Sequence, residues 1–112
     1  MRRLLTIVAA FVSITAGAQT FTMLENDIVV VQINAEWNDN NTRRDLEKLR
    51  GCEYRFGSLE DQPEALQKSV RAIPVVVIYR NGRPAQQYTA DISFTLGTPF
   101  EEIQNRVYEL KQ

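Results

Sequence analysis

The side chains best suited to chemistry lie in one short stretch, residues 35–41, which we refer to as the corner. It joins a β-branched run at 28–33, typical of a strand covered on both faces, to a charged segment at 42–50 that is predicted to be a helix. Many α/β folds place their chemistry where a strand meets the start of a helix. The corner ends in Asn38, Asp39, Asn40 and Asn41, and it contains no cysteine, histidine, serine or lysine.

These four polar residues have two interpretations. Their side-chain oxygens can accept hydrogen bonds from the free N–H groups at a helix start, so they are expected to cap the helix at 42–50. The alternative is an anion or a peptide carbonyl bound there, although the charge of Asp39 would oppose an anion. A calcium site needs more carboxylates than this loop offers, and we predict no metal and no cofactor. Asn40, Asn41 and Thr42 also form a glycosylation sequon, which matters only in a eukaryotic source.

Cys52 is the only cysteine, and it follows the glycine expected to end the helix at 42–50. Its structural interpretation is a small, partly buried residue that opens a strand. The functional alternative is a free thiol that forms a disulfide with another protein. A lowered thiol pKa would need nearby positive charge, and only Arg50 and Arg55 are close in sequence. The chain has no histidine, which removes the commonest general base.

The N-terminus has the pattern of a signal peptide. Two arginines precede an apolar stretch at 4–16, and Ala16-Gly17-Ala18 then places small residues before Gln19. The apolar stretch is shorter than the ~20 residues of a spanning helix. We expect residues 1–18 to be a signal peptide and 19–112 to be one exported domain, periplasmic or secreted. A first core helix or a short membrane anchor is the alternative.

Charge and composition limit the partners of the exported domain. Removing Arg2 and Arg3 leaves 11 basic against 14 acidic residues, and no basic cluster is visible. This weak acidity indicates no nucleic-acid binding, and we expect no membrane contact beyond the signal segment. One cysteine allows no internal disulfide, so the domain must be stabilised by its apolar core.

The rest of the chain alternates strands and helices. We expect a strand at 52–56, followed by a short helix after a capping box at 61–64. A strand at 73–79 and a return strand at 85–90 are joined by an Asn-Gly type I′ turn at 81–82. The chain then forms an amphipathic helix at 98–110 whose N-cap is Thr98. Helical connections favour parallel pairing of the first three strands, and the hairpin adds an antiparallel edge. The fold class is therefore α/β, a mixed sheet of about four strands with helices on both faces.

Three motifs in this order carry a resemblance: Ala35-Glu36-Trp37 after the first strand, Ile73-Pro74 at the head of an apolar strand, and Tyr79-Arg80-Asn81-Gly82 at the hairpin. Together they resemble the thioredoxin family over residues 28–110. The resemblance implies a thioredoxin-like fold, in which Ile73-Pro74 is the cis-proline element.

The resemblance also shows departures from the family. It implies that Asn38 and Asn41 occupy the positions of the two redox cysteines, and that Gln32 replaces the buried aspartate that manages proton transfer there. Carboxamides can neither attack a disulfide nor be oxidised to one. We therefore expect a redox-inactive, thioredoxin-like protein, because the family's fold does not by itself imply its activity.

Two features that the resemblance implies, Trp37 and the Ile73-Pro74 turn, could bind a partner without any cysteine. Trp37 either packs against its loop or is an exposed anchor for a partner. Ile73, which precedes Pro74, offers backbone groups that pair with an extended peptide in the family; alternatively, Pro74 only shapes the sheet edge. Our main hypothesis is binding of a protein or peptide across Trp37, residues 38–41 and Ile73-Pro74. The alternatives are a thiol-redox protein that acts through Cys52 and a purely structural or assembly subunit.

Overall fold

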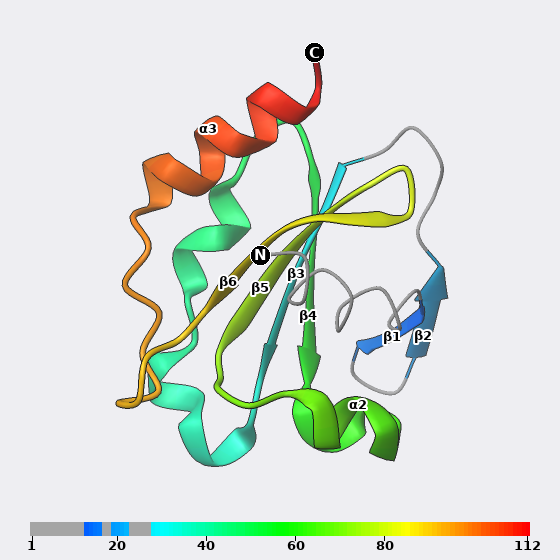
Figure 1. The fold of residues 1–112 in the computed structure, drawn as a ribbon, viewed down its shortest axis with the longest axis vertical. Coiled ribbons are helices and arrows are strands. Elements are labelled where there is room, and N and C mark those ends of the chain that lie inside the picture. Colours follow the sequence, from blue (N-terminus) through cyan, green and yellow to red (C-terminus); the bar gives the residue numbers. More distant parts are fainter. Residues whose placement is uncertain (1–12, 17–18, 23–27) are drawn as a thin grey trace.

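The computed structural model describes residues 13–16, 19–22 and 28–112 (Figure 1). The predicted signal peptide lies outside the described residues except for β1, Ser13–Ala16. β1 pairs antiparallel with β2, Gln19–Thr22, to form a two-stranded sheet. Within the described residues no helix is both long enough and apolar enough to cross a membrane.

The main sheet has four strands in the order β4-β3-β5-β6. Their bounds are β3 Ile28–Asn34, β4 Glu53–Ser58, β5 Val75–Arg80 and β6 Arg83–Thr89. The central strand β3 is fully buried, as its β-branched run predicts. It pairs parallel with β4 and antiparallel with β5, and β5 pairs antiparallel with β6. The predicted mixed α/β sheet is therefore confirmed.

The expected parallel direction of the third strand is wrong. β4 ends level with β3, and β5 begins at that same end, since Val75 pairs with Ile33. The connection contains α2, Glu64–Ser69, and the 3₁₀ turn η3, Leu59–Asp61. Six helical residues advance only ~9 Å, whereas returning along a six-residue strand needs ~20 Å. The connection therefore stays at the end of the sheet (Figure 1), and β5 runs back.

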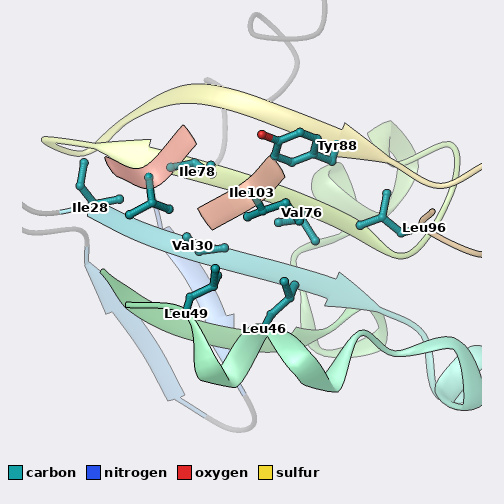
Figure 2. Close-up of a cluster of buried hydrophobic side chains, with 10 residues drawn as sticks. Ile28, Val30, Leu46, Leu49, Val76, Ile78, Tyr88, Leu96 and Ile103 are labelled. Atoms are coloured by element: carbon teal, nitrogen blue, oxygen red, sulfur yellow. The ribbon is translucent and has the colours of Figure 1, made fainter. Parts of the chain in front are cut away.

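The first face of the sheet carries the larger core (Figure 2). Alternate residues of the strands point into it, and α3, Phe100–Leu110, covers them with Ile103 and Val107. Leu46 and Leu49 add to this core, as predicted. The second face buries a smaller cluster of strand residues, against which Leu59 and Val70, from η3 and the end of α2, pack. Helical elements thus contact both faces.

The predicted α-helix at 42–50 is wrong. Two 3₁₀ segments occur instead, η1, Glu36–Asn41, and η2, Arg44–Lys48, and Thr42 and Arg43 between them are extended. The Gln32 side chain accepts a hydrogen bond from Arg43 N (2.8 Å) and donates one to Arg43 O (3.0 Å). Because this pairing holds Arg43 as a neighbouring strand would, a continuous α-helix cannot pass through it.

The hairpin is confirmed, since Asn81 and Gly82 both have positive φ, 55° and 80°. The expected side-chain caps of the other helices are not formed. Asp61 belongs to η3, and α2 begins after Pro63 without a side-chain cap. Similarly, α3 begins at Phe100 after an extended Pro99, so Thr98 does not cap it. These corrections shift helix starts and leave the sheet unchanged.

Candidate functional site

The corner lies at the C-terminal end of β3, where η1 turns the chain away from the sheet. Neither η1 nor η2 has a side-chain capping hydrogen bond, so the expected role of residues 38–41 as caps is wrong. Asn38 points inward and is only 5% exposed. Asp39 and Asn40 are exposed, and Asn41 is partly buried. Asn38 and Asn41, whose side chains are hydrogen-bonded to each other, therefore contribute to the interior of the corner rather than to a helix end.

Asn38 connects three segments of the chain. Its Nδ2 donates to Asn34 Oδ1 (2.9 Å) and Phe94 O (3.1 Å), with a longer contact to Ile73 O (3.4 Å). Its Oδ1 accepts a hydrogen bond from Asn41 Nδ2 (2.8 Å). One neutral side chain thus joins η1 to the Ile73–Pro74 turn and to the loop at 91–97.

Asn34 and Gln32 continue these interactions along β3, and both are buried. Asn34 Nδ2 donates to Asn38 O (2.9 Å) and Thr42 Oγ1 (2.8 Å). Gln32 Nε2 donates to Tyr54 Oη (2.8 Å) as well as to Arg43 O. We refer to Gln32, Asn34, Asn38 and Asn41 as the carboxamide network. Because its members are neutral at all ordinary pH values, the network can neither supply nor accept a catalytic proton.

The Ile73–Pro74 peptide bond is cis, and both residues are buried. Pro74 O accepts a hydrogen bond from Ala90 N (3.2 Å). Ile73 O receives the long contact from Asn38, whereas Ile73 N–H donates no hydrogen bond within the described part of the chain. This turn is next to the corner, because Asn38 contacts Ile73 O and Phe94 O with the same nitrogen.

Trp37 combines the two interpretations of the sequence. Its ring packs edge-on against Phe94, with centroids 5.0 Å apart at 90°, yet its side chain is 66% exposed. Phe94 belongs to the loop at 91–97, which also exposes Ile92 almost completely. We refer to Trp37, Ile92 and Phe94 as the apolar patch. The sequence did not predict Ile92 or Phe94 as site residues, and their positions in a polar loop give no periodic signal.

The loop at 91–97 is held by the carboxylate of Asp91. Asp91 Oδ1 accepts hydrogen bonds from Ser93 N (2.9 Å), Ser93 Oγ and Thr95 Oγ1 (3.3 Å). The hydrogen bonds from Ser93 hold the pKa of Asp91 below its usual value, so this carboxylate stays charged. Within this turn Phe94 has a φ of 61°, which is uncommon for an aromatic residue. The hydrogen bonds of Asp91 and the contact with Trp37 therefore hold this loop and the Phe94 ring at the corner.

The remaining corner residues form surface contacts. Asp39 Oδ2 accepts a hydrogen bond from Arg44 (3.0 Å), and both side chains are exposed. Such exposed pairs contribute little to stability. Within the described residues, no three cysteine, aspartate or glutamate side chains are grouped so that they could hold a metal ion.

Cys52 lies far from the corner. It precedes Glu53, which pairs with Val29 near the start of β3, whereas the corner follows Asn34; this separation is about five strand residues, or roughly 16 Å. Its side chain packs against the first core. Burial raises the pKa of the Cys52 thiol to about 11, although the charge of Lys111 acts in the opposite direction. At neutral pH the thiol is therefore protonated and a poor nucleophile.

The Asn38→Asp variant tests the carboxamide network. A carboxylate at this position would face the oxygens of Asn34, Ile73 and Phe94, so its pKa should rise above the unfolded value of ~3.9. A raised carboxyl pKa favours the protonated native state, so stability should fall as the pH rises from about 4 through the folded-state pKa. Urea unfolding at pH 4.5, 5.5 and 7 should show this loss for Asn38→Asp and not for the exposed control Asn40→Asp. Equal pH profiles for the two variants would contradict the network.

The reactivity of Cys52 gives a second test. Because only the thiolate reacts, the alkylation rate with iodoacetamide should rise about tenfold per pH unit between pH 8 and 10, with a midpoint near the pKa of about 11. Mass spectrometry of the alkylated chain measures this rate against a cysteine-containing peptide. A plateau below pH 8.5 would mean that Cys52 is an activated thiol.

The comparisons with known proteins support the fold. The sequence matches no protein-family model and no curated protein. Among solved structures, the thioredoxin of Fasciola hepatica is similar with a TM-score of 0.58 and 19% identity, over 78% of this chain and 84% of that one. A thioredoxin of Malassezia sympodialis is similar with a TM-score of 0.47 and 17% identity, over 80% of this chain and 79% of that one. The first of these similarities establishes that this chain has a thioredoxin-like fold, an α/β domain with a four-stranded mixed sheet.

Proposed function

We propose that this chain is an exported, redox-inactive thioredoxin-like domain that binds a segment of a partner protein at the corner. The observation that carries the proposal is the exposed Trp37, which is held on Phe94 beside the Ile73–Pro74 turn. Export rests on the signal-peptide pattern of residues 1–18.

The loss of redox activity is supported by the side chains present. The chain has one cysteine, so it cannot form the dithiol pair that cycles with a disulfide. By the resemblance, Asn38 and Asn41 stand at the two redox positions, and their side chains share a 2.8 Å hydrogen bond. Asn38 is also buried and bonded on both its oxygen and its nitrogen. In this proposal, the amides preserve the shape of a redox corner without its chemistry.

The binding role is supported by the exposed Trp37 and by one backbone donor without an acceptor in the buried turn before Pro74. Tryptophan is the residue type most enriched at energetically important positions of interfaces. Ile73 N–H has no acceptor within the described residues, and an extended segment that pairs with this turn would supply a carbonyl acceptor. The apolar patch and this donor are joined through Asn38, so one extended segment can contact both.

The two alternatives have less support. A redox protein acting through Cys52 would need an accessible thiolate, yet this thiol is partly buried and has a raised pKa. A purely structural subunit would need no exposed tryptophan, and the helix-capping role that made the corner structural is not formed.

Trp37→Ala should strongly weaken capture of the partner. Removing a tryptophan from the centre of an interface commonly costs 2 kcal/mol or more, about a 30-fold loss of affinity. The test is a pull-down from the exported fraction of the source cells with the full chain as bait, followed by measurement of the affinity of each captured protein. Tyr108→Ala is the matched control, because Tyr108 is an exposed aromatic residue on α3. If every captured protein binds Trp37→Ala and the wild type equally, the proposal fails.

A further inference from the structure

We infer, building on the proposed function, that the bound segment is extended and carries a bulky apolar side chain next to a lysine or arginine. The inference names the chemistry of the partner at the same corner. It rests on the exposure of the apolar patch, on the backbone group that the corner offers, and on the sign of the surrounding charge.

The apolar patch supplies the contact for the bulky side chain. Among the described residues, four large apolar side chains are exposed, and three of them belong to the patch. Ile92 is 96% exposed and Trp37 is 66% exposed, and Ile92 shares the loop at 91–97 with Phe94, against which Trp37 packs. The fourth, Tyr108, lies on α3. Exposed apolar area is thus concentrated at the corner.

The patch is preformed rather than assembled on binding. Phe94 is fixed by its backbone N–H, which donates to Asp91 O (3.0 Å), and by its carbonyl, which accepts from Asn38. The Phe94 ring then packs edge-on against Trp37, with centroids 5.0 Å apart. A preformed surface loses less conformational entropy on binding, so a short segment can bind measurably.

The backbone of the turn selects an extended segment. Ile73 O already receives the contact from Asn38, whereas Ile73 N–H is left as a donor. A single main-chain donor beside an apolar patch suits a segment in β conformation. In such a segment one backbone carbonyl can accept the hydrogen bond from Ile73 N–H while a neighbouring side chain contacts the apolar patch.

The charged groups around the patch are mainly acidic. The exposed carboxylates of the adjoining segments are Glu36, Asp39, Glu60, Asp61 and Asp91, and the exposed guanidinium groups are Arg44 and Arg71. Glu60 lies beside the patch, because its Oε2 accepts a hydrogen bond from Glu36 N (3.0 Å) next to Trp37. Asp91 directly precedes Ile92 in the loop at 91–97.

The cations nearby compensate only part of this charge. Arg44 is paired with Asp39, so Arg71 is the one other exposed cation among these described segments, and Glu60 and Asp91 have no salt bridge within the described residues. The bonds that hold Asp91 come from Ser93 and Thr95, which are neutral. A flanking lysine or arginine on the partner would be attracted to these two carboxylates, whereas an acidic segment would be repelled. Charge complementarity therefore favours a basic partner.

Short peptides test this inference directly. The probes are three acetylated and amidated hexapeptides: Ala-Lys-Phe-Lys-Ala-Ala, the same peptide with both lysines replaced by glutamate, and the same peptide with serine in place of phenylalanine. Trp37 is the only tryptophan of the chain, so its fluorescence reports binding to the full-length protein without a label. We expect the lysine–phenylalanine peptide to bind at least about tenfold more tightly than either control, and less tightly in 0.5 M salt.

Matched variants locate the charge effect. Glu60→Gln and Asp91→Asn each remove a charge but keep an oxygen that can accept the hydrogen bonds from Glu36 N and Ser93 N. Each should weaken binding of the lysine–phenylalanine peptide about threefold or more. Glu101→Gln, the same charge change on the exposed side of α3, should leave binding unchanged.

The outcomes separate the inference from the proposed function. If the glutamate peptide binds as tightly as the lysine peptide, or if the two charge variants bind like the wild type, the inference is wrong. The proposed function then still stands, provided that calorimetry shows weaker binding to Trp37→Ala. If no peptide changes the fluorescence of Trp37 up to millimolar concentration, both the inference and the binding of extended segments at the corner are wrong.

Discussion

The side chain of Asn38 is the constraint on which the corner depends. Its amide contacts β3 through Asn34, the turn before Pro74 through Ile73 O, and the loop at 91–97 through Phe94 O. Each of these groups is otherwise a polar atom in or near the interior, where an unmet hydrogen bond is costly. One buried carboxamide thereby places three distant segments of the chain together and holds the apolar patch above them.

The neutrality of the network decides what this corner can do. A buried carboxylate would change its charge with pH and would need a cation, whereas Gln32, Asn34 and Asn38 remain neutral and satisfy one another and the backbone. The carboxamide network is therefore held in shape by its own hydrogen bonds and carries no ionisable group or thiol of its own. In the function proposed above, such a preformed network suits recognition, since recognition needs preformed geometry and no reactive group.

The sequence predicted the strands and the hairpin well because the β-branched runs and the Asn-Gly turn act locally, but it did not predict the antiparallel direction of β5. It failed where a distant side chain decides the local structure: Gln32 takes both backbone groups of Arg43, and the helix expected at 42–50 becomes two 3₁₀ segments. The inward direction of Asn38 likewise depends on tertiary contacts. The burial of Asn34 beside Gln32 could have been predicted, because residues two apart in a strand lie on the same face. No sequence pattern predicts the exposure of Phe94, since that exposure follows from the hydrogen bonds within its own loop.

The most direct test of this account is the oxidation state of the double variant Asn38→Cys with Asn41→Cys. Both residues lie in η1, three positions apart, and their side chains share a 2.8 Å hydrogen bond, so we expect the two cysteines to form an intramolecular disulfide in oxidised glutathione and to give the chain a disulfide-reductase activity above that of the wild type. Asn38→Cys with Asn40→Cys is the control, because Asn40 is exposed. A folded double variant whose two thiols stay free, as measured by mass spectrometry after alkylation, would contradict it.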